Sequence, residues 1–178
     1  VIVFAQGASQ QWYGRDTGVN VVRNADNTAA MVLTRFGGMS CAPTPQGIVN
    51  TVFPAAVTLG DGRVLVTGGF TQVAGNKLTG ASSQAFLFDP RTGLSEPLGS
   101  IGVGRAGHAA VYLEETNKVV LIGGMTELGI DTGKLFPYVF DAADGLDDYV
   151  LFDVATKAFT PGTERMVAAR GFPRTALM

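Results

Sequence analysis

Short apolar runs separated by glycine- and proline-containing turns dominate this chain. The phrases GRVLVTGGF at 62–70 and NKVVLIGGM at 117–125 each consist of a branched aliphatic run that stops at a glycine pair. A further strand-like run precedes each phrase, at 53–59 and 107–113. No window shows a sustained 3.6-residue period, so helices are not expected. The pattern predicts an all-β chain of short strands joined by turns.

The same pattern continues after each glycine pair. A long connection leads to a third run, which ends in Phe88-Asp89 in the first copy and in Phe152-Asp153 in the second. The glycine pairs recur after about 55 residues, a period typical of repeat architectures. Each copy then adds a short fourth run, so the repeating unit is a four-stranded one. The fourth runs are 94–98 and 158–162.

The units continue at both ends of the chain. The stretch 104–113 is echoed by 169–178, with Arg105 and Arg170 in the same place, so a further first strand is expected at the C-terminal end. The N-terminal run 1–5 fits a second strand, and 29–36 fits a third. We therefore divide the partial repeat array 1–178 into three parts with approximate bounds: a degenerate unit at 1–59, then units at 60–113 and 114–178.

Turn chemistry supports these strands. Asp61-Gly62 predicts a two-residue type I′ hairpin, because both central positions of that turn need a positive φ that Asp and Gly tolerate. The stretch 114–117 forms the longer counterpart in the next unit. In DPRTG at 89–93, Asp, Pro and Gly each favour a turn for a different reason: hydrogen bonding, a preset φ and a left-handed φ.

These features resemble kelch repeats, in which each unit is one four-stranded blade of a β-propeller. The glycine pairs match the end of the kelch second strand, and Phe88-Asp89 and Phe152-Asp153 match its third strand. Phe159 stands at the aromatic position of the fourth strand, where the preceding unit has Ser95. Arg105 and His108 match the Arg-x-x-His opening of a first strand. The resemblance is specific over 53–178 and is closest to kelch proteins secreted by, or displayed on, bacteria.

The resemblance implies an incomplete propeller. Stacking sheets that are apolar on both faces around a hub covers those faces, and closure takes about four to eight blades. Three units cannot close, so we expect the remaining blades to come from the same chain, from another chain or from symmetry copies.

Composition narrows the function classes. The chain has 178 residues, and 13 basic and 15 acidic residues give a net charge of −2, which offers no basic field for nucleic acid. No apolar run is long enough to cross a bilayer, so no membrane span is expected. The single cysteine, Cys41, cannot form an internal disulfide.

We expect binding residues on the face that carries the long connections 6–28, 70–84 and 125–147. Trp12, Tyr13 and Arg15 form an aromatic and cationic cluster of the kind enriched at interfaces, although packing of the connection onto its blade explains them too. Tyr138 is a further contact candidate, and a small loop core is the alternative for it.

Two other groups of residues are candidates. Asp141, Asp144, Asp147 and Asp148 offer hard oxygens that suit calcium, although their spacing matches no EF-hand and solvated loop acids are common. Apart from this calcium possibility, no cofactor is expected. Arg105 and His108 face either the central channel or backbone groups between blades. Galactose-oxidase-type propellers hold copper with two His and two Tyr, a set that one histidine cannot supply.

Three functions remain open. The leading hypothesis is a non-catalytic binding scaffold for a protein or glycan partner, outside the cytoplasm at a bacterial surface, in the periplasm or secreted. The second is a segment of a carbohydrate-active enzyme, galactose-oxidase-like or epimerase-like, whose catalytic residues lie elsewhere. The third is a structural blade segment of a multi-chain assembly.

Overall fold

The computed structural model describes residues 2–6, 11–15, 22–26, 34–35, 51–131 and 139–175, with side chains at 22–26, 51–129 and 144–175. These residues form β-strands and one short 3-10 helix, η1 (Glu114–Thr116), and contain no α-helix. The all-β prediction is confirmed. Within the described part of the chain, no helix has the length and hydrophobicity of a membrane span.

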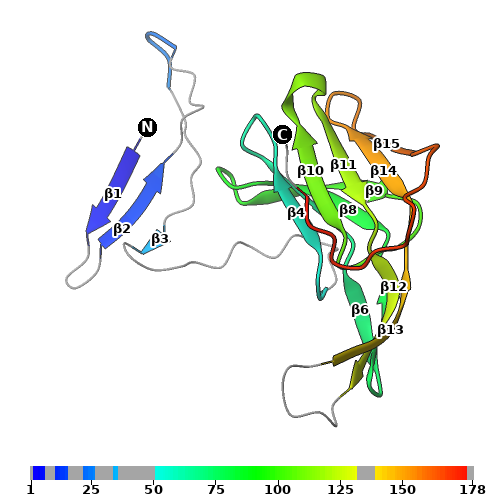
Figure 1. Ribbon diagram of the computed structural model, residues 1–178. Coiled ribbons are helices and arrows are strands. Elements are labelled where there is room, and N and C mark those ends of the chain that lie inside the picture. The colour runs from blue at the N-terminus through cyan, green and yellow to red at the C-terminus, as the bar shows by residue number, and fades with distance from the viewer. Residues whose placement is uncertain are drawn as a thin grey trace.

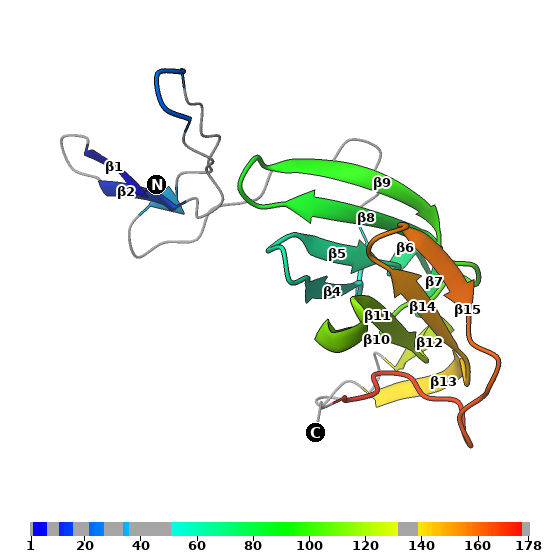
Figure 2. The same ribbon diagram turned by 90° about the horizontal axis from the view of Figure 1, so that it is seen from above.

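Two four-stranded antiparallel sheets form the body of the molecule, and they are the predicted blades. Blade one has the strand order β4-β5-β8-β9 and blade two the order β10-β11-β14-β15. The two blades lie side by side in Figures 1 and 2. The strands of blade one are β4 (Ala55–Thr58), β5 (Val64–Thr67), β8 (Gln84–Asp89) and β9 (Leu94–Ser100). Those of blade two are β10 (Ala109–Leu113), β11 (Lys118–Ile122), β14 (Tyr149–Asp153) and β15 (Ala158–Pro161).

The main core lies between the facing surfaces of the two blades. Leu65 and Leu87 of blade one pack in one cluster with Val119, Leu121 and Phe152 of blade two. Alternate residues of the same strands are only half-buried, because they point to the outer face of each blade. Burial of one face against the next sheet is what stabilises each blade, as stacked propeller sheets require.

The expected type I′ turn at Asp61-Gly62 is not formed. Gly62 has a φ of +85°, but Asp61 is not among the residues with positive φ. Instead, Leu59 N donates to Arg63 O, which leaves a three-residue loop with glycine in the left-handed position. The Asp61 carboxylate accepts a hydrogen bond from Arg63 N, and this local bond holds Asp61 out of the left-handed region.

We expected the connections between second and third strands to be simple loops. They are instead hairpins, which together form a third sheet. The strand order of this platform sheet is β13-β12-β7-β6, so each blade contributes one hairpin. The two hairpins join through antiparallel pairing of β12 with β7. The strands are β6 (Phe70–Ala74), β7 (Lys77–Ala81), β12 (Met125–Asp131) and β13 (Val139–Gly145).

The N-terminal region forms a separate three-stranded sheet in the order β1-β2-β3. Its strands are β1 (Ile2–Gln6), β2 (Gln11–Arg15) and β3 (Thr34–Arg35). The strand predicted at 1–5 coincides with β1, but β1 pairs with β2 rather than with a strand from 29–36. Residues 11–15, which we expected in a long connection, therefore form a strand.

Candidate functional site

The glycine pairs make the seam where one unit meets the next. Gly69 N donates to Arg105 O at 2.9 Å, and in the next copy Gly124 N donates to Arg170 O at 2.8 Å. Gly68 and Gly69 both have positive φ, and a Cβ on Gly68 would lie 2.1 Å from Arg105 O. Because no side chain fits at that distance, the glycine pair is required both for its conformation and for the close approach of two backbones.

Arg105 is the most deeply buried charge of the seam. Its side chain is 0% exposed, and its Nη1 donates to Gly123 O at 2.9 Å and to Asp148 Oδ1 at 3.0 Å. Its Nη2 donates to Asp148 Oδ2 at 3.2 Å, so the carboxylate is held by both ends of the guanidinium. Of the two roles proposed for Arg105, the structure assigns the one between blades, since these partners belong to the following unit.

His108 is buried in the same seam. Its Nε2 shares a 2.7 Å hydrogen bond with Thr67 Oγ1 of the preceding blade. Burial, aided by the positive charge of Arg105, lowers the pKa of His108 from 6.5 to about 3. The imidazole is therefore neutral near pH 7. Its Nδ1 has no hydrogen-bond partner within the described part of the chain.

A small cavity lies at the entry to the first strands of three successive units. Phe53, Gly107 and Phe172 hold equivalent positions there and all have left-handed φ, at 60°, 58° and 50°. Gly107 N donates to Phe53 O at 2.9 Å, and Phe172 N donates to Gly107 O at 2.7 Å. The Phe53 and Phe172 rings meet edge to face at 5.1 Å. The cavity has a volume of about 220 Å³ and is lined by Phe53, Pro54, Gly107, His108, Phe172 and Pro173.

Sequence reasoning found Arg105 and His108 but missed Thr67, the partner of His108, and the two phenylalanines. A signal was present, because Phe-Pro opens the first-strand run of two units, at 53–54 and 172–173, although the dipeptide also occurs at 136–137 in a connection. These positions align with Gly107-His108 once the units are superposed on their seams. Thr67 carried no signal, since its role depends on the contact between blades.

Two of the predicted calcium ligands, Asp147 and Asp148, have arginine partners. Asp148 is bound by Arg105, and Asp147 forms an ion pair with Arg165. Asp144 is exposed, and the side chain of Asp141 lies outside the described residues. Among described residues, no group of three or more His, Cys, Asp or Glu side chains is close enough to hold a metal. Calcium binding stays a prediction.

The aromatic candidates fall mostly outside the described residues. Trp12, Tyr13 and Arg15 lie in β2, where only the backbone is described, and Trp12 is paired there with Ala5 and Arg35. Tyr138 lies outside the described residues. The structure therefore brings together Arg105, His108 and Asp148, and leaves the aromatic cluster as a prediction.

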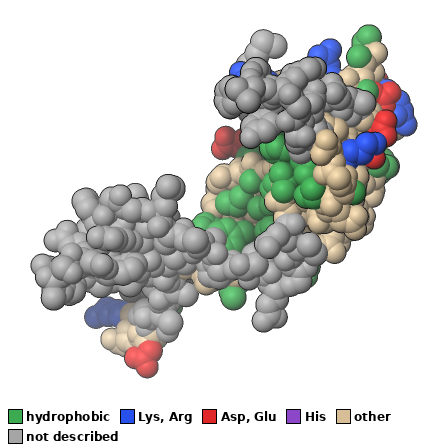
Figure 3. All heavy atoms as spheres, turned by 90° about the horizontal axis from the view of Figure 1, so that it is seen from below, with side chains coloured by type: hydrophobic (Ala, Val, Ile, Leu, Met, Phe, Trp, Pro, Cys, Tyr) green, Lys and Arg blue, Asp and Glu red, His purple; other side chains and the backbone are tan. Residues whose placement is uncertain are grey.

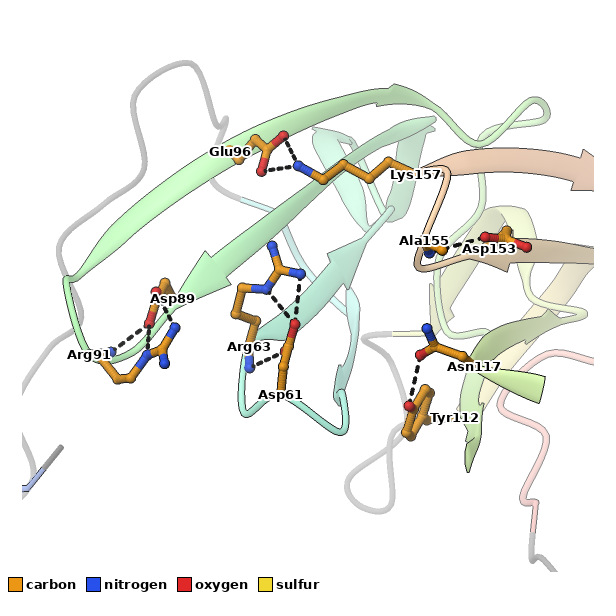
Figure 4. A network of polar contacts seen from close by, with 10 residues as sticks. All are labelled: Asp61, Arg63, Asp89, Arg91, Glu96, Tyr112, Asn117, Asp153, Ala155 and Lys157. Carbon is orange, nitrogen blue, oxygen red and sulfur yellow. Dashed lines mark hydrogen bonds and ion pairs between the residues drawn. The ribbon is translucent and has the colours of Figure 1, made fainter. Parts of the chain in front are cut away.

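The rim opposite the platform sheet carries short turns tied by local polar contacts (Figure 4). Arg63 hydrogen bonds to Asp61, and Arg91 to Asp89. In each case the arginine side chain holds the pKa of the carboxyl below its usual value. Backbone hydrogen bonding from Thr156, first of all, lowers the pKa of Asp153 in the same way. These acids serve the turns in which they stand.

Comparison with known proteins supports the fold. No family model and no curated protein matches the chain. Among solved structures, the chain is similar to a novel fungal alcohol oxidase of the AA5 family in complex with copper, with a TM-score of 0.57 and 19% identity over 95% of this chain. The protein YjhT matches with a TM-score of 0.44 and 10% identity over 69% of this chain. The chain spans 30% of the length of each of these proteins.

The seam residues do not fit a copper centre like the one implied by that oxidase. Copper in an oxidase site is typically held by several imidazoles, but this chain contains one histidine. That histidine, His108, has its Nε2 hydrogen bonded to Thr67, and only its Nδ1 is without a partner among the described residues, so it offers at most one imidazole nitrogen. No chemical step is therefore assigned to a metal, and the likeness shows an incomplete set of antiparallel four-stranded propeller blades.

Proposed function

We propose that this chain is part of a kelch-type β-propeller and acts as a non-catalytic binding scaffold for a protein or glycan. The observation that carries the proposal is the platform sheet, in which hairpins from two blades pair through β7 and β12. Loops that only connect strands need no shared sheet. A sheet that spans two blades gives a fixed surface, on which contact residues hold their positions without a large ordering cost.

The outward face of the platform sheet is polar. Lys77 and Glu127, from different hairpins, form an ion pair at its surface, and their side chains are 56% and 36% exposed. Gln72 of β6 stands opposite Thr79 of β7 on the same strand pair. Amide, hydroxyl and charged groups arranged in this way supply the hydrogen bonds that orient a glycan or a polar protein surface. Arg105 and His108, in contrast, are occupied by contacts between blades.

The remaining blades complete the scaffold in this proposal, from the same chain or from another. Hydrophobic side chains gather on one face of the blade region in Figure 3. The outward-facing positions of β5 and β11, such as Val66 and Ile122, are only half-buried. Apolar faces of this kind are covered by neighbouring sheets in a closed propeller. The whole protein acts outside the cytoplasm in this proposal, on the basis of its resemblance to secreted and surface kelch proteins.

The test is a binding assay with a matched control. The full-length protein is screened against a glycan array and candidate surface proteins, and hits are titrated by calorimetry. Lys77→Ala/Glu127→Ala should weaken binding at least tenfold. Glu96→Ala/Lys157→Ala removes the same chemistry from the blades and should leave affinity unchanged. Equal affinities for both variants would reject the platform sheet as the binding surface.

A second candidate is a segment of a carbohydrate-active enzyme, favoured by the cavity beside His108. Its catalytic residues would come from the blades beyond this chain. The test is whether the full-length protein turns over a sugar or an alcohol. Turnover that is lost when the catalytic residues of the other blades are substituted would support this candidate and contradict the scaffold.

A further inference from the structure

Strand β6 forms one edge of the platform sheet and carries an exposed apolar residue, Val73. The equivalent residue of the second hairpin, Leu128, is buried. Val73 of β6 is 72% exposed, although it stands opposite the buried Leu78 of β7. Leu78 also stands opposite Leu128 of β12, which is 1% exposed. Directly opposite residues of neighbouring strands share a face. Leu128, Leu78 and Val73 therefore form one apolar row across three strands, and only its last member is uncovered.

Val73 and Leu128 hold equivalent places in the two hairpins. Phe70, which opens β6, forms an isolated bridge with Val52, and Met125, which opens β12, forms one with Ala106. Val73 follows Phe70, and Leu128 follows Met125, at the same spacing along the chain, so Val73 and Leu128 are equivalent. Leu128 is buried because the second strand of the preceding hairpin pairs with β12. On the same side, β6 has only the single bridge to Val52 among the described residues.

The chain contains a hairpin in the position along the sequence that this edge requires. β1 and β2 form an antiparallel hairpin that lies N-terminal to blade one, as the β6–β7 hairpin lies N-terminal to blade two, although β8 and β9 follow the latter hairpin and only β3 follows the former. The second strand of each hairpin begins at the residue that closes its turn, Gln11 in β2 and Lys77 in β7. By this alignment Trp12 takes the place of Leu78, and both residues are apolar in sequence.

We propose that β2 of the N-terminal hairpin docks along the outer edge of β6 and extends the platform sheet by one hairpin. The pairing is antiparallel and places residue 12 opposite residue 73 and residue 11 opposite residue 74. In the arrangement of Figure 1, β2 pairs with β1 along its full length and with β3 only at Trp12 and Tyr13. Docking replaces the two-residue pairing of β2 with β3 by a pairing of β2 with β6, which also covers Val73. This proposal does not depend on which ligand the platform sheet binds.

Disulfide trapping tests the proposed register. In the full chain with Cys41→Ala, the pair Trp12→Cys/Val73→Cys should form an intramolecular disulfide at least tenfold faster than Tyr13→Cys/Val73→Cys. The Cα atoms of directly opposite residues lie about 4.5–5.5 Å apart, within the range a disulfide spans. Successive residues of a strand alternate between the two faces of a sheet, so a shift of one residue separates the two Cβ atoms. Peptide mapping by mass spectrometry identifies the bond.

Equal rates for the two pairs would overturn the proposal, as would a bond that forms only between two molecules, because a second copy would then occupy the edge. Hydrogen exchange supplies an independent readout without cysteines. Val73→Lys should raise the exchange rate of β2 and β6 amides at least tenfold while leaving β11 and β14 protected. Unchanged exchange in β2 would contradict docking even if the trapped bond forms.

Discussion

Arg105 and Arg170 hold the same place in consecutive units, yet only one of them is buried. Their backbones make matching contacts, because Arg105 N donates to Ser82 O and Arg170 N to Leu146 O, both at 3.1 Å. The Arg105 side chain is enclosed and bound to Asp148, whereas Arg170 is exposed. The difference lies in the neighbouring unit, because Arg105 has blade two beside it. Backbone hydrogen bonds therefore fix how two units meet at a seam, and side chains of the next unit bury the arginine there.

Removing the buried member of this pair should have the largest effect. Arg105→Met leaves the Asp148 carboxylate without its partner, and we expect the free energy of unfolding to fall by about 3 kcal/mol. Arg170→Met should change it by no more than about 0.5 kcal/mol, as for an ordinary surface residue. Urea unfolding of the two variants measures the difference. Similar losses in both would show that the seam does not depend on its side chains.

The glycine pairs extend the comparison to the backbone. A Cβ at Gly68 would lie 2.1 Å from Arg105 O, but one at Gly123 would lie 2.7 Å from Arg170 O. Both glycines have positive φ, so alanine is strained at either site. We expect Gly68→Ala to cost about 3 kcal/mol and Gly123→Ala about 1–2 kcal/mol less, because the later seam has more room to relax. Thermal unfolding of the two variants checks this order.

The pH dependence of stability isolates His108, whose counterparts in the other units are Pro54 and Pro173. Its pKa in the folded chain, about 3, lies below the ordinary 6.5. The unfolded state therefore binds the proton first. The contribution of His108 to the free energy of unfolding is therefore fully present above pH 6.5. It is lost as the pH falls from 6.5 to 3, by at most about 1.4 kcal/mol per pH unit. Between pH 7 and 5 the loss should reach about 2 kcal/mol.

His108→Gln should flatten that dependence, because the amide does not titrate and can still bond to Thr67. Denaturant titrations at pH 7, 6 and 5 compare the variant with the parent chain. This range stays above the titration of the turn aspartates, whose pKa values are lowered below 3.8. An equal slope in the variant would assign the pH dependence to another group.

The smallest effect is expected from the ion pair that joins the blades at their rim. Lys157 Nζ and Glu96 Oε1 are 2.6 Å apart, but both side chains are more than two-fifths exposed. Water and salt screen such pairs, so Glu96→Ala/Lys157→Ala should cost no more than about 0.5 kcal/mol. A double-mutant cycle measures the coupling. A larger value would mean that rim contacts, and not the seam, set the blade spacing.

Much of the blade architecture could be predicted from the sequence, since strands, turns and glycine pairs depend on local patterns. The glycines at 68 and 123 marked both strand ends and seams. The platform sheet could not be predicted in this way, because pairing of Leu78 with Leu128 joins segments from different units. Likewise, Asp148 looked like a metal ligand beside its acidic neighbours. Its arginine partner is remote in sequence and only the fold brings them together.

The two hairpins of the platform sheet differ in length, whereas the backbone hydrogen bonds of the two seams match. The second connection is longer, and its extra residues fall between the same two blade strands as in the first. The hairpin tips are thus sites where the chain accommodates insertions without shifting blade geometry. Foreign peptides grafted between Ala74 and Lys77 should be displayed at a defined orientation, which would make this segment a starting point for engineered recognition surfaces.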